Sequence, residues 1–539
     1  MAVMKTPGVY IVEKSAFPNS VVEVATAVPA FVGHTEFADN RNKPLTLTPW
    51  RISSMAEYHQ FFGGPPKAMF NIVETAAQPD FRAATEIDQP DSVKGFHLEQ
   101  VAGAEGGNFG LYNALRHFYQ NGGGPCYIVS VGSYLDELDA DRFKAGIDEL
   151  LKEQEPTMLL VPEAVRFSEE VCIDLQQAML SHCGHKMRNR MAILDVYNGD
   201  RPLNHPDGNP IEAFRDGLGI NFLDFASAYY PWLNTTIIGE KDLSFENIAG
   251  DSVELLKNLI RTELRLPYPL PEGASAQARA LSGAIDEISA DFPQLVRSEA
   301  AKRPNAKPLS PDDLSAGILA RKALLNKTLS RSSSVFNTVL TESRRHLNVM
   351  PPSSAMAGVY TMVDNTRGVW KAPANVSLNG VISPTVNISA EQQEDLNVTA
   401  QGKSINAIRS FIGEGVLVWG ARTLDGNSLD WRYVNVRRTM IMLEESCRLA
   451  AKAMVFEPNT ANTWVTIKSM VSNFLTSVWK RGGLMGAVPE DAFSVHVGLG
   501  ETMTADDVLE GILRVSVLVA MVRPAEFIEI TFQQQMPKS

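Results

Sequence analysis

The chain has 539 residues, which is too long for a single hydrophobic core of ordinary size, so two or more domains are expected. Its residues are 44% hydrophobic and 21% charged, a composition typical of folded globular proteins and far from that of disordered chains. The formal net charge of -13 argues against general nucleic-acid binding, because contact with phosphates needs clustered Lys and Arg.

Four widely spaced cysteines predict buried thiols in a reducing compartment rather than a disulfide framework. The N-terminus shows no apolar segment of the secretory type. The longest strongly apolar stretch, 515–522, is too short to span a bilayer. We therefore expect a protein that is assembled in the bacterial cytoplasm and is not itself inserted into a membrane.

The first predicted element is a short extended segment, Val9 to Glu13, which follows the break at Pro7-Gly8. A second β-rich run is predicted from Val21 to Gly33. At about 3.3 Å per residue, some twenty extended residues span about 65 Å. A compact chain of this length has a radius of gyration of only about 24 Å. The N-terminus could therefore reach a neighbouring subunit as an arm.

Residues 50–235 alternate between helical patterns and continuous apolar runs. Helices are predicted at 110–119 and in the run that ends at Leu150. The predicted buried strands are 126–131, 158–161 and 191–196. This alternation is typical of a parallel α/β sheet covered by helices.

Residues 236–350 change character. The stretch 266–273, LPYPLPEG, is a rigid break among helical segments, and we interpret the whole region as an insertion. From Pro351 to about Pro384 the sequence again predicts β and loop structure.

The clearest helices lie in the C-terminal part. One apolar stripe with 3- and 4-residue spacing consists of Met440, Leu443, Cys447, Ala450 and Met454. Glu444 and Arg448 are expected to form an i,i+4 pair on the other side. A second stripe from Trp464 to Val478 ends at Gly482-Gly483, and a short strand is predicted over 527–532.

Neither enzyme chemistry nor a cofactor site is indicated by the sequence. Gly402-Lys403-Ser404 lacks the earlier glycine of a P-loop, because position 397 is Asn. No Gly-x-Ser-x-Gly or His-Glu-x-x-His motif occurs. The cluster from Ser181 to His185, with Cys172 upstream, lacks the second pair of ligands that a zinc site needs. We therefore predict no catalytic, cofactor-binding or metal-binding residue.

Nine short segments carry a further signal when they are taken together. They are 6–13 (TPGVYIVE), 28–33 (VPAFVG), 351–360 (PPSSAMAGVY), 364–375 (DNTRGVWKAPAN), 430–438 (DWRYVNVRR), 444–446 (EES), 456–459 (FEPN), 486–493 (GAVPEDAF) and 522–527 (VRPAEF). In order and spacing these segments resemble the tail sheath family of contractile phages and phage-tail-like contractile injection systems. The resemblance covers 1–235 and 351–535, with its closest match in the C-terminal part.

This resemblance implies a mixed α/β, multidomain sheath protein. Such a protein polymerises as stacked hexameric rings around an inner tube protein, together with baseplate and terminal cap proteins, and contracts to drive the tube through a target envelope. The implied divisions are an N-terminal linker arm (1–20), an α/β sheath domain (21–235 with 351–400), an outer insertion (236–350), a C-terminal core domain (401–520) and a C-terminal linker strand (521–539).

The resemblance also implies strand exchange between neighbouring subunits. The residues expected to take part are Val9, Tyr10, Ile11, Val12, Phe527, Ile528, Ile530 and Phe532. Lys468, Lys480 and Arg481 are candidates for contact with the tube, since a basic helix end complements an acidic surface. A merely solvated helix end is the alternative. The rival for the whole chain is an α/β hydrolase-type enzyme of subtilisin-like fold, which would form a discrete small oligomer.

Overall fold

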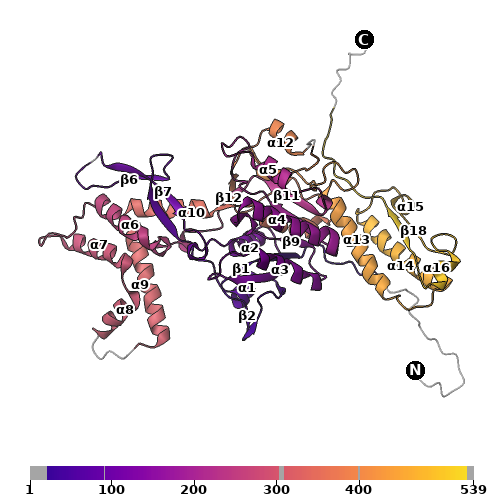
Figure 1. Cartoon of the computed structure of the whole chain (residues 1–539), viewed down its shortest axis with the longest axis horizontal. Coiled ribbons are helices and arrows are strands. Elements are labelled where there is room, and N and C mark those ends of the chain that lie inside the picture. Colours follow the sequence, from indigo (N-terminus) through magenta and orange to yellow (C-terminus); the bar gives the residue numbers. More distant parts are fainter. Residues whose placement is uncertain (1–20, 90, 303–308, 398–400, 531–539) are drawn as a thin grey trace, which may run out of the picture.

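The computed structural model describes residues 21–89, 91–302, 309–397 and 401–530. The molecule is elongated, as Figure 1 shows, with a central α/β body between two smaller parts. An outer lobe of helices and a small sheet lies on one side of the body, and a largely helical C-terminal domain lies on the other. The mixed α/β, multidomain fold expected from the sequence is confirmed.

A nine-stranded sheet forms the centre of the body. Across the sheet the strands are β14 (Val376–Ser377), β17 (Gly415–Val418), β16 (Asn406–Phe411), β11 (Ala226–Tyr230), β10 (Met191–Asp195), β9 (Met158–Leu160), β1 (Pro29–Thr35), β8 (Cys126–Ser133) and β4 (Trp50–Ile52). The strands from β16 to β8 are parallel, and the antiparallel strands lie at the two edges. The predicted strands are β8, β9 and β10, and each is almost wholly buried, as continuous apolar strands of parallel sheets are.

Helices cover both faces of this sheet. The covering helices are α2 (Leu111–Gln120) and α11 (Ser353–Arg367) on one face, and α3 (Ala140–Glu149) and α4 (Glu169–Ser181) on the other. Successive strand residues point to opposite faces. Accordingly Phe31 packs against Phe118 of α2, with ring centroids 5.3 Å apart. Its neighbour Val32 packs against Gly146 of α3, where an added Cβ would lie 3.0 Å from Val32 Cγ1.

The prediction of β and loop structure directly after Pro351 is wrong, because residues 353–367 form helix α11. Every residue from Ser353 to Thr361 is buried, so this part of the helix has no polar face and shows no amphipathic period in the sequence. Its first backbone N–H, on Ser353, donates to Asp195 Oδ1 at 2.9 Å. Shorter strands, β14 and β15 (Val381–Pro384), follow it as predicted.

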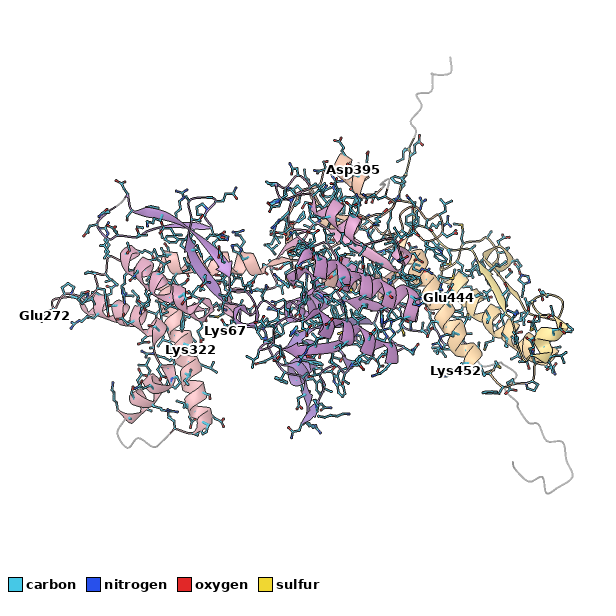
Figure 2. The ribbon with its side chains drawn as sticks, in the orientation of Figure 1. Lys67, Glu272, Lys322, Asp395, Glu444 and Lys452 are labelled. Carbon is cyan, nitrogen blue, oxygen red and sulfur yellow. The ribbon has the colours of Figure 1, made fainter. Side chains whose placement is uncertain are left out.

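The outer lobe is built from two separate stretches of sequence. Its helices are α6 (Gly250–Glu263), α7 (Ala276–Asp286), α8 (Phe292–Ala301), α9 (Pro311–Ser332) and α10 (Ser334–Leu347). Its antiparallel sheet, β5 (Phe70–Glu74), β7 (Val93–Gln100) and β6 (Phe81–Ala84), precedes the predicted insertion by more than a hundred residues. The two stretches share one apolar core, which includes Phe70, Phe96 and Phe336. Glu246 joins them electrostatically, since its carboxylate lies 2.7 Å from Lys322 Nζ and 3.9 Å from Lys67 Nζ. Figure 2 labels the two lysines, which lie near each other on the outer lobe.

The ends of the 236–350 region meet at the body. Strand β12 (Leu233–Thr235) enters the region, and β13 (Val349–Met350) leaves it. The two strands are antiparallel neighbours, with Leu233 opposite Met350. A segment whose ends are joined in this way projects from the body without breaking the central sheet.

The C-terminal domain packs two long helices against a small sheet. The helices are α13 (Val434–Lys452) and α14 (Ala461–Lys480), followed by α15 (Pro489–Ala492) and α16 (Ala505–Leu509). The sheet consists of β18 (Phe493–His496) and β19 (Ser516–Val519). Both predicted helices form, but the predicted Glu444–Arg448 pair does not: Arg448 Nε binds Glu445 Oε2 at 2.8 Å (Figure 2 labels Glu444).

Candidate functional site at the two chain ends

The start of the described chain is held against α13 and α14. The N–H of Val24 donates to Ser446 Oγ at 3.1 Å, and Arg438 Nη2 donates to the carbonyl of Thr26 at 2.8 Å. Arg438 is buried and also pairs with Asp364 at 2.6 Å. Residues 21–28 form no strand, so the β-rich run predicted from Val21 begins in fact at Pro29. The predicted exchange residues Val9, Tyr10, Ile11 and Val12 lie outside the described residues.

The end of the described chain is anchored at Glu526. Its Oε2 accepts hydrogen bonds from Arg422 Nη2 at 2.7 Å and from the Tyr433 hydroxyl at 3.0 Å. The two side chains of the ion pair are only 4% and 18% exposed. Asn435 Nδ2 holds the same segment four residues earlier, by donating to the carbonyl of Val522 at 3.1 Å.

Beyond this anchor the chain leaves the surface. Phe527, Ile528 and Ile530 are 77%, 78% and 70% exposed. No strand is assigned over 524–530, and Phe532 lies outside the described residues. Three large apolar side chains this exposed on one short segment are a feature of binding surfaces.

Sheet β18–β19 contains two strands. Their register runs from Phe493 opposite Val519 to His496 opposite Ser516. Within the described parts of the chain no third strand joins them. Leu518 on β19 is 62% exposed. A sheet this small has unpaired backbone groups at its edges, which makes it a template for strands from another chain.

The three predicted tube-contact residues do not form one free patch. Lys468 and Lys480 are exposed on α14 but lie about 18 Å apart along the axis, at about 1.5 Å per residue. Arg481 is engaged within the chain: its guanidinium pairs with Glu23 and lies 5.2 Å from the centre of the Trp370 ring. Arg481 therefore helps to hold the N-terminal segment in place.

The residues that sequence reasoning missed are Arg422, Tyr433 and Glu526. Glu526 has no distinguishing signal around it in the sequence, because Arg523 and Glu529 are also charged residues of the same terminal segment. Its partner Arg422 follows β17 with no motif around it. Only the packing of the body places the two residues together.

The Gly402–Ser404 fragment and the 181–185 cluster make contacts within the body. Lys403 donates its ammonium protons to the carbonyl of Arg215, and Arg215 Nε donates back to the carbonyl of Lys403 at 3.0 Å. His182 lies 3.3 Å from Arg190 Nη1. Burial and this guanidinium lower the pKa of His182 to about 3, and burial raises the pKa of Cys183 to about 12. In the described chain, residues 181–185 do not converge with further ligands on a metal position.

The C-terminal part of the chain is similar to tail sheath proteins of contractile phages. Residues 427–535 match the phage tail sheath C-terminal domain family. A tail sheath protein of Vibrio phage KVP40 is 26% identical over 138 residues, 25% of this chain and 20% of that protein. A tail sheath protein of Burkholderia phage BcepMu is 29% identical over 141 residues, 25% of this chain and 29% of that protein. These matches thus span less than a third of the curated relatives.

Solved structures extend the likeness to the whole chain. The anti-feeding prophage baseplate structure, symmetrised six-fold, contains a chain that is 27% identical with a TM-score of 0.55, over 99% of this chain and 100% of that one. The contracted sheath complex of the extracellular contractile injection system PVC contains one that is 26% identical with a TM-score of 0.55, over 99% of each chain. Along its whole length the chain is therefore similar to subunits of contractile injection systems, and its resemblance to the contractile tail sheath family is confirmed. The hydrolase alternative finds no support in these comparisons.

In the part of the chain that the structure describes, no helix combines the length and apolarity needed to cross a bilayer.

Proposed function

We propose that this chain polymerises as stacked hexameric rings around an inner tube and contracts to drive that tube through a target envelope. The observation that carries the proposal is that one subunit has both features. It has an exposed apolar segment that is anchored at Glu526, and it has the two-stranded sheet β18–β19. One subunit thereby offers both a free strand and a sheet edge. These are the two halves of a head-to-tail contact, which generates rings or helical polymers rather than closed dimers.

Strand exchange is the proposed link between neighbours. A terminal arm that adds to β18–β19 of the next subunit satisfies backbone N–H and C=O groups directly, with side-chain pockets giving specificity. On the C-terminal side the arm would use Phe527, Ile528, Ile530 and Phe532, and on the N-terminal side Val9, Tyr10, Ile11 and Val12. Because each arm is fixed to its own body only over a short segment at its base, the bodies could rotate without losing the link.

The remaining assignments follow from this arrangement. The proposed divisions along the sequence are the arm 1–20, the sheath domain 21–235 with 351–400, the insertion 236–350, the core domain 401–520 and the linker strand 521–539. In space, β5, β6 and β7 of the sheath domain lie in the outer lobe, and β16 and β17 of the core domain belong to the central sheet. Lys468 and Lys480 would face the tube, and Arg481 would support the adjacent N-terminal segment. Further partners would be baseplate and terminal cap proteins. Assembly would take place in the cytoplasm. Contraction would need no nucleotide, cofactor or enzymatic step, because compaction of a metastable extended lattice supplies the work.

Expression of the chain alone, followed by negative-stain electron microscopy, tests the proposal. Hollow, helically striated cylinders are the expected result, in the contracted form because no tube holds them extended. Uniform small particles that stay small on concentration would contradict it. Contraction of a purified particle that required added ATP would contradict the nucleotide-free mechanism.

A further inference from the structure

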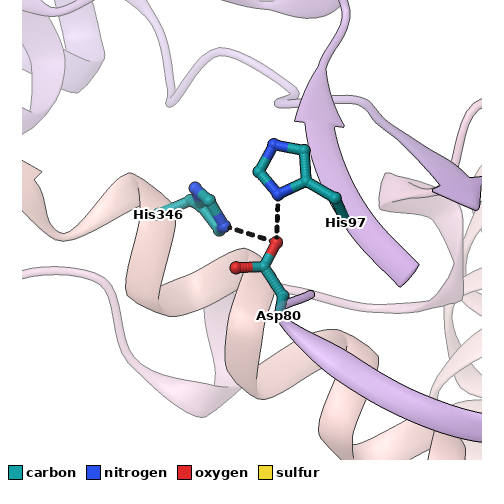
Figure 3. Close-up of side chains that lie close together, drawn as sticks. All are labelled: Asp80, His97 and His346. Carbon is teal, nitrogen blue, oxygen red and sulfur yellow. Dashed lines mark hydrogen bonds and ion pairs between the residues drawn. The ribbon is translucent and has the colours of Figure 1, made fainter. Parts of the chain in front are cut away.

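Three side chains from three elements of the outer lobe converge on one point, as Figure 3 shows. Asp80 directly precedes β6, His97 lies in β7, and His346 lies in the last turn of α10. Asp80 Oδ2 lies 2.8 Å from His97 Nδ1 and 3.0 Å from His346 Nε2. One atom from each of the three residues lies within 4.8 Å of the others. The cluster is remote in sequence from both chain ends and independent of the proposed strand exchange.

The carboxylate of Asp80 is held in place by groups outside this trio. The N–H of Leu98 donates to Oδ2 at 2.8 Å, and Arg345 Nη2 donates to Oδ1 at 2.7 Å. Arg345 also pairs with Glu342 at 2.5 Å. Two carboxylates and one guanidinium leave a net charge of -1 next to the two imidazoles. Outer hydrogen bonds of this kind orient the carboxylates of metal sites and tune their ligands.

The open side of the cluster is the side of the imidazoles. The Asp80 side chain is 8% exposed, whereas those of His97 and His346 are 40% and 30% exposed. An ion can therefore enter from solvent without any rearrangement of the lobe. The imidazole rings meet nearly edge to face, at 72° with centroids 5.7 Å apart, so they do not stack and close the opening.

The donor set has a chemical preference. Two imidazole nitrogens and one carboxylate oxygen suit late first-row divalent ions, and three protein ligands leave one tetrahedral position for water. Zn–N and Zn–O bonds of about 2.0–2.2 Å place neighbouring ligand atoms about 3.4 Å apart. The O–N separations of 2.8 and 3.0 Å would need to open by only about half an ångström.

We propose that Asp80, His97 and His346 bind one late first-row divalent cation of the Zn²⁺ type, with water as the remaining ligand. The ion ties the β6–β7 hairpin to α10, the helix that returns from the outer lobe to the body. Its effect is therefore on the stability of the outer lobe, since an ion that binds only the folded state raises the free energy of unfolding.

Zn²⁺ itself is the probe for this site. The full chain, stripped with a chelator, is dialysed against Zn²⁺ at neutral pH, and bound metal is measured. The wild type should bind one equivalent, and His97→Gln and His346→Gln should each weaken binding at least tenfold. His496→Gln is the matched control: His496 lies 2.6 Å from Glu501 in an exposed pair that offers only two ligands. It should bind Zn²⁺ like the wild type.

Thermal unfolding gives an independent readout. Zn²⁺ should raise the melting temperature of the wild type and of His496→Gln, but not that of the His97→Gln, His346→Gln double variant. Absence of stoichiometric binding to the wild type would overturn the proposal. So would equal binding by the double variant, which would indicate an adventitious ion only.

Discussion

Glu526 and Arg422, which are 104 residues apart in sequence, form an ion pair with 2.7 Å between Oε2 and Nη2. The pair fixes the point at which the C-terminal segment leaves the body. Val522 and Glu526 are hydrogen-bonded to the chain's own domain, and the apolar residues Phe527, Ile528 and Ile530 after them are exposed. Position 526 thus separates the part of the terminus that belongs to this subunit from the part available to another.

Replacement of Glu526 by Gln should release the C-terminal segment. Arg422 would lose its partner while it remains nearly buried, and loss of one partner of a buried pair costs about 3 kcal/mol. We expect faster backbone hydrogen exchange over 520–526 and weaker polymerisation. Glu529→Gln, an exposed change in the same segment, is the control. Unchanged exchange in Glu526→Gln would mean that the pair does not anchor the segment.

The double substitution Ile528→Asn, Ile530→Asn should abolish polymers and leave the folded chain intact. In an extended strand residues 528 and 530 point to the same face. Burial of each side chain in a neighbour would stabilise the contact by about 1.5–3 kcal/mol. Sedimentation and electron microscopy measure the outcome. Glu529→Gln, on the opposite face, should polymerise normally, and polymers of the double variant would refute the strand-exchange assignment.

Lys480 and Arg481 are adjacent but should respond differently to substitution. Lys480→Glu with Lys468→Glu changes exposed charges, so it should weaken co-sedimentation with tube protein at low salt and leave proteolysis unchanged. Arg481→Glu would place a like charge beside Glu23 and should increase cleavage near residues 21–26. Normal tube binding by the double lysine variant would show that Lys468 and Lys480 of α14 do not contact the tube.

Gly358 is a position where α11 and the end of α2 approach too closely for any side chain. A Cβ there would lie 2.6 Å from the carbonyl oxygen of Phe118 and 2.8 Å from Asn121 Cβ. Gly358→Ala should therefore lower the free energy of unfolding by about 1–3 kcal/mol. Gly283→Ala, in α7 with no atom within 4 Å, should instead raise it by about 0.5–1 kcal/mol. Denaturant unfolding compares them, and equal effects would contradict the packing argument.

Asp195 should make the protein less stable as the pH rises. Burial raises its pKa to about 7, although Ser353 donates two hydrogen bonds that oppose the shift. The folded chain therefore holds a proton that the unfolded chain has released, between about pH 4 and about pH 7. Across that window the folded state loses up to a few kcal/mol relative to the unfolded state.

Asp195→Asn should remove this dependence, so its stability relative to the wild type should increase from pH 4.5 to pH 8. Chemical unfolding at a series of pH values measures the difference. Asp312→Asn, an exposed change in α9, is the control. Its free energy of unfolding should change with pH in the same way as that of the wild type. A constant difference between Asp195→Asn and the wild type would show that Asp195 does not titrate in this range.

The sequence by itself determined the elements whose patterns are local. Continuous apolar runs predicted β8, β9 and β10, and one-sided stripes predicted α13 and α14, because strands buried on both faces and amphipathic helices carry these periods in the chain itself. The ordered set of short segments was sufficient to indicate the sheath family.

Only the tertiary structure decided features that depend on partners distant in sequence. Helix α11 has no visible period because the body surrounds it, and residues 70–100 join the outer lobe through a core shared with helices far downstream. The Arg422–Glu526 anchor likewise joins residues 104 positions apart, and the Asp80–His97–His346 cluster is completed by His346, which lies 266 positions after Asp80. Such contacts leave no local pattern, because the free energy that selects them comes from packing and charge pairing in the folded chain.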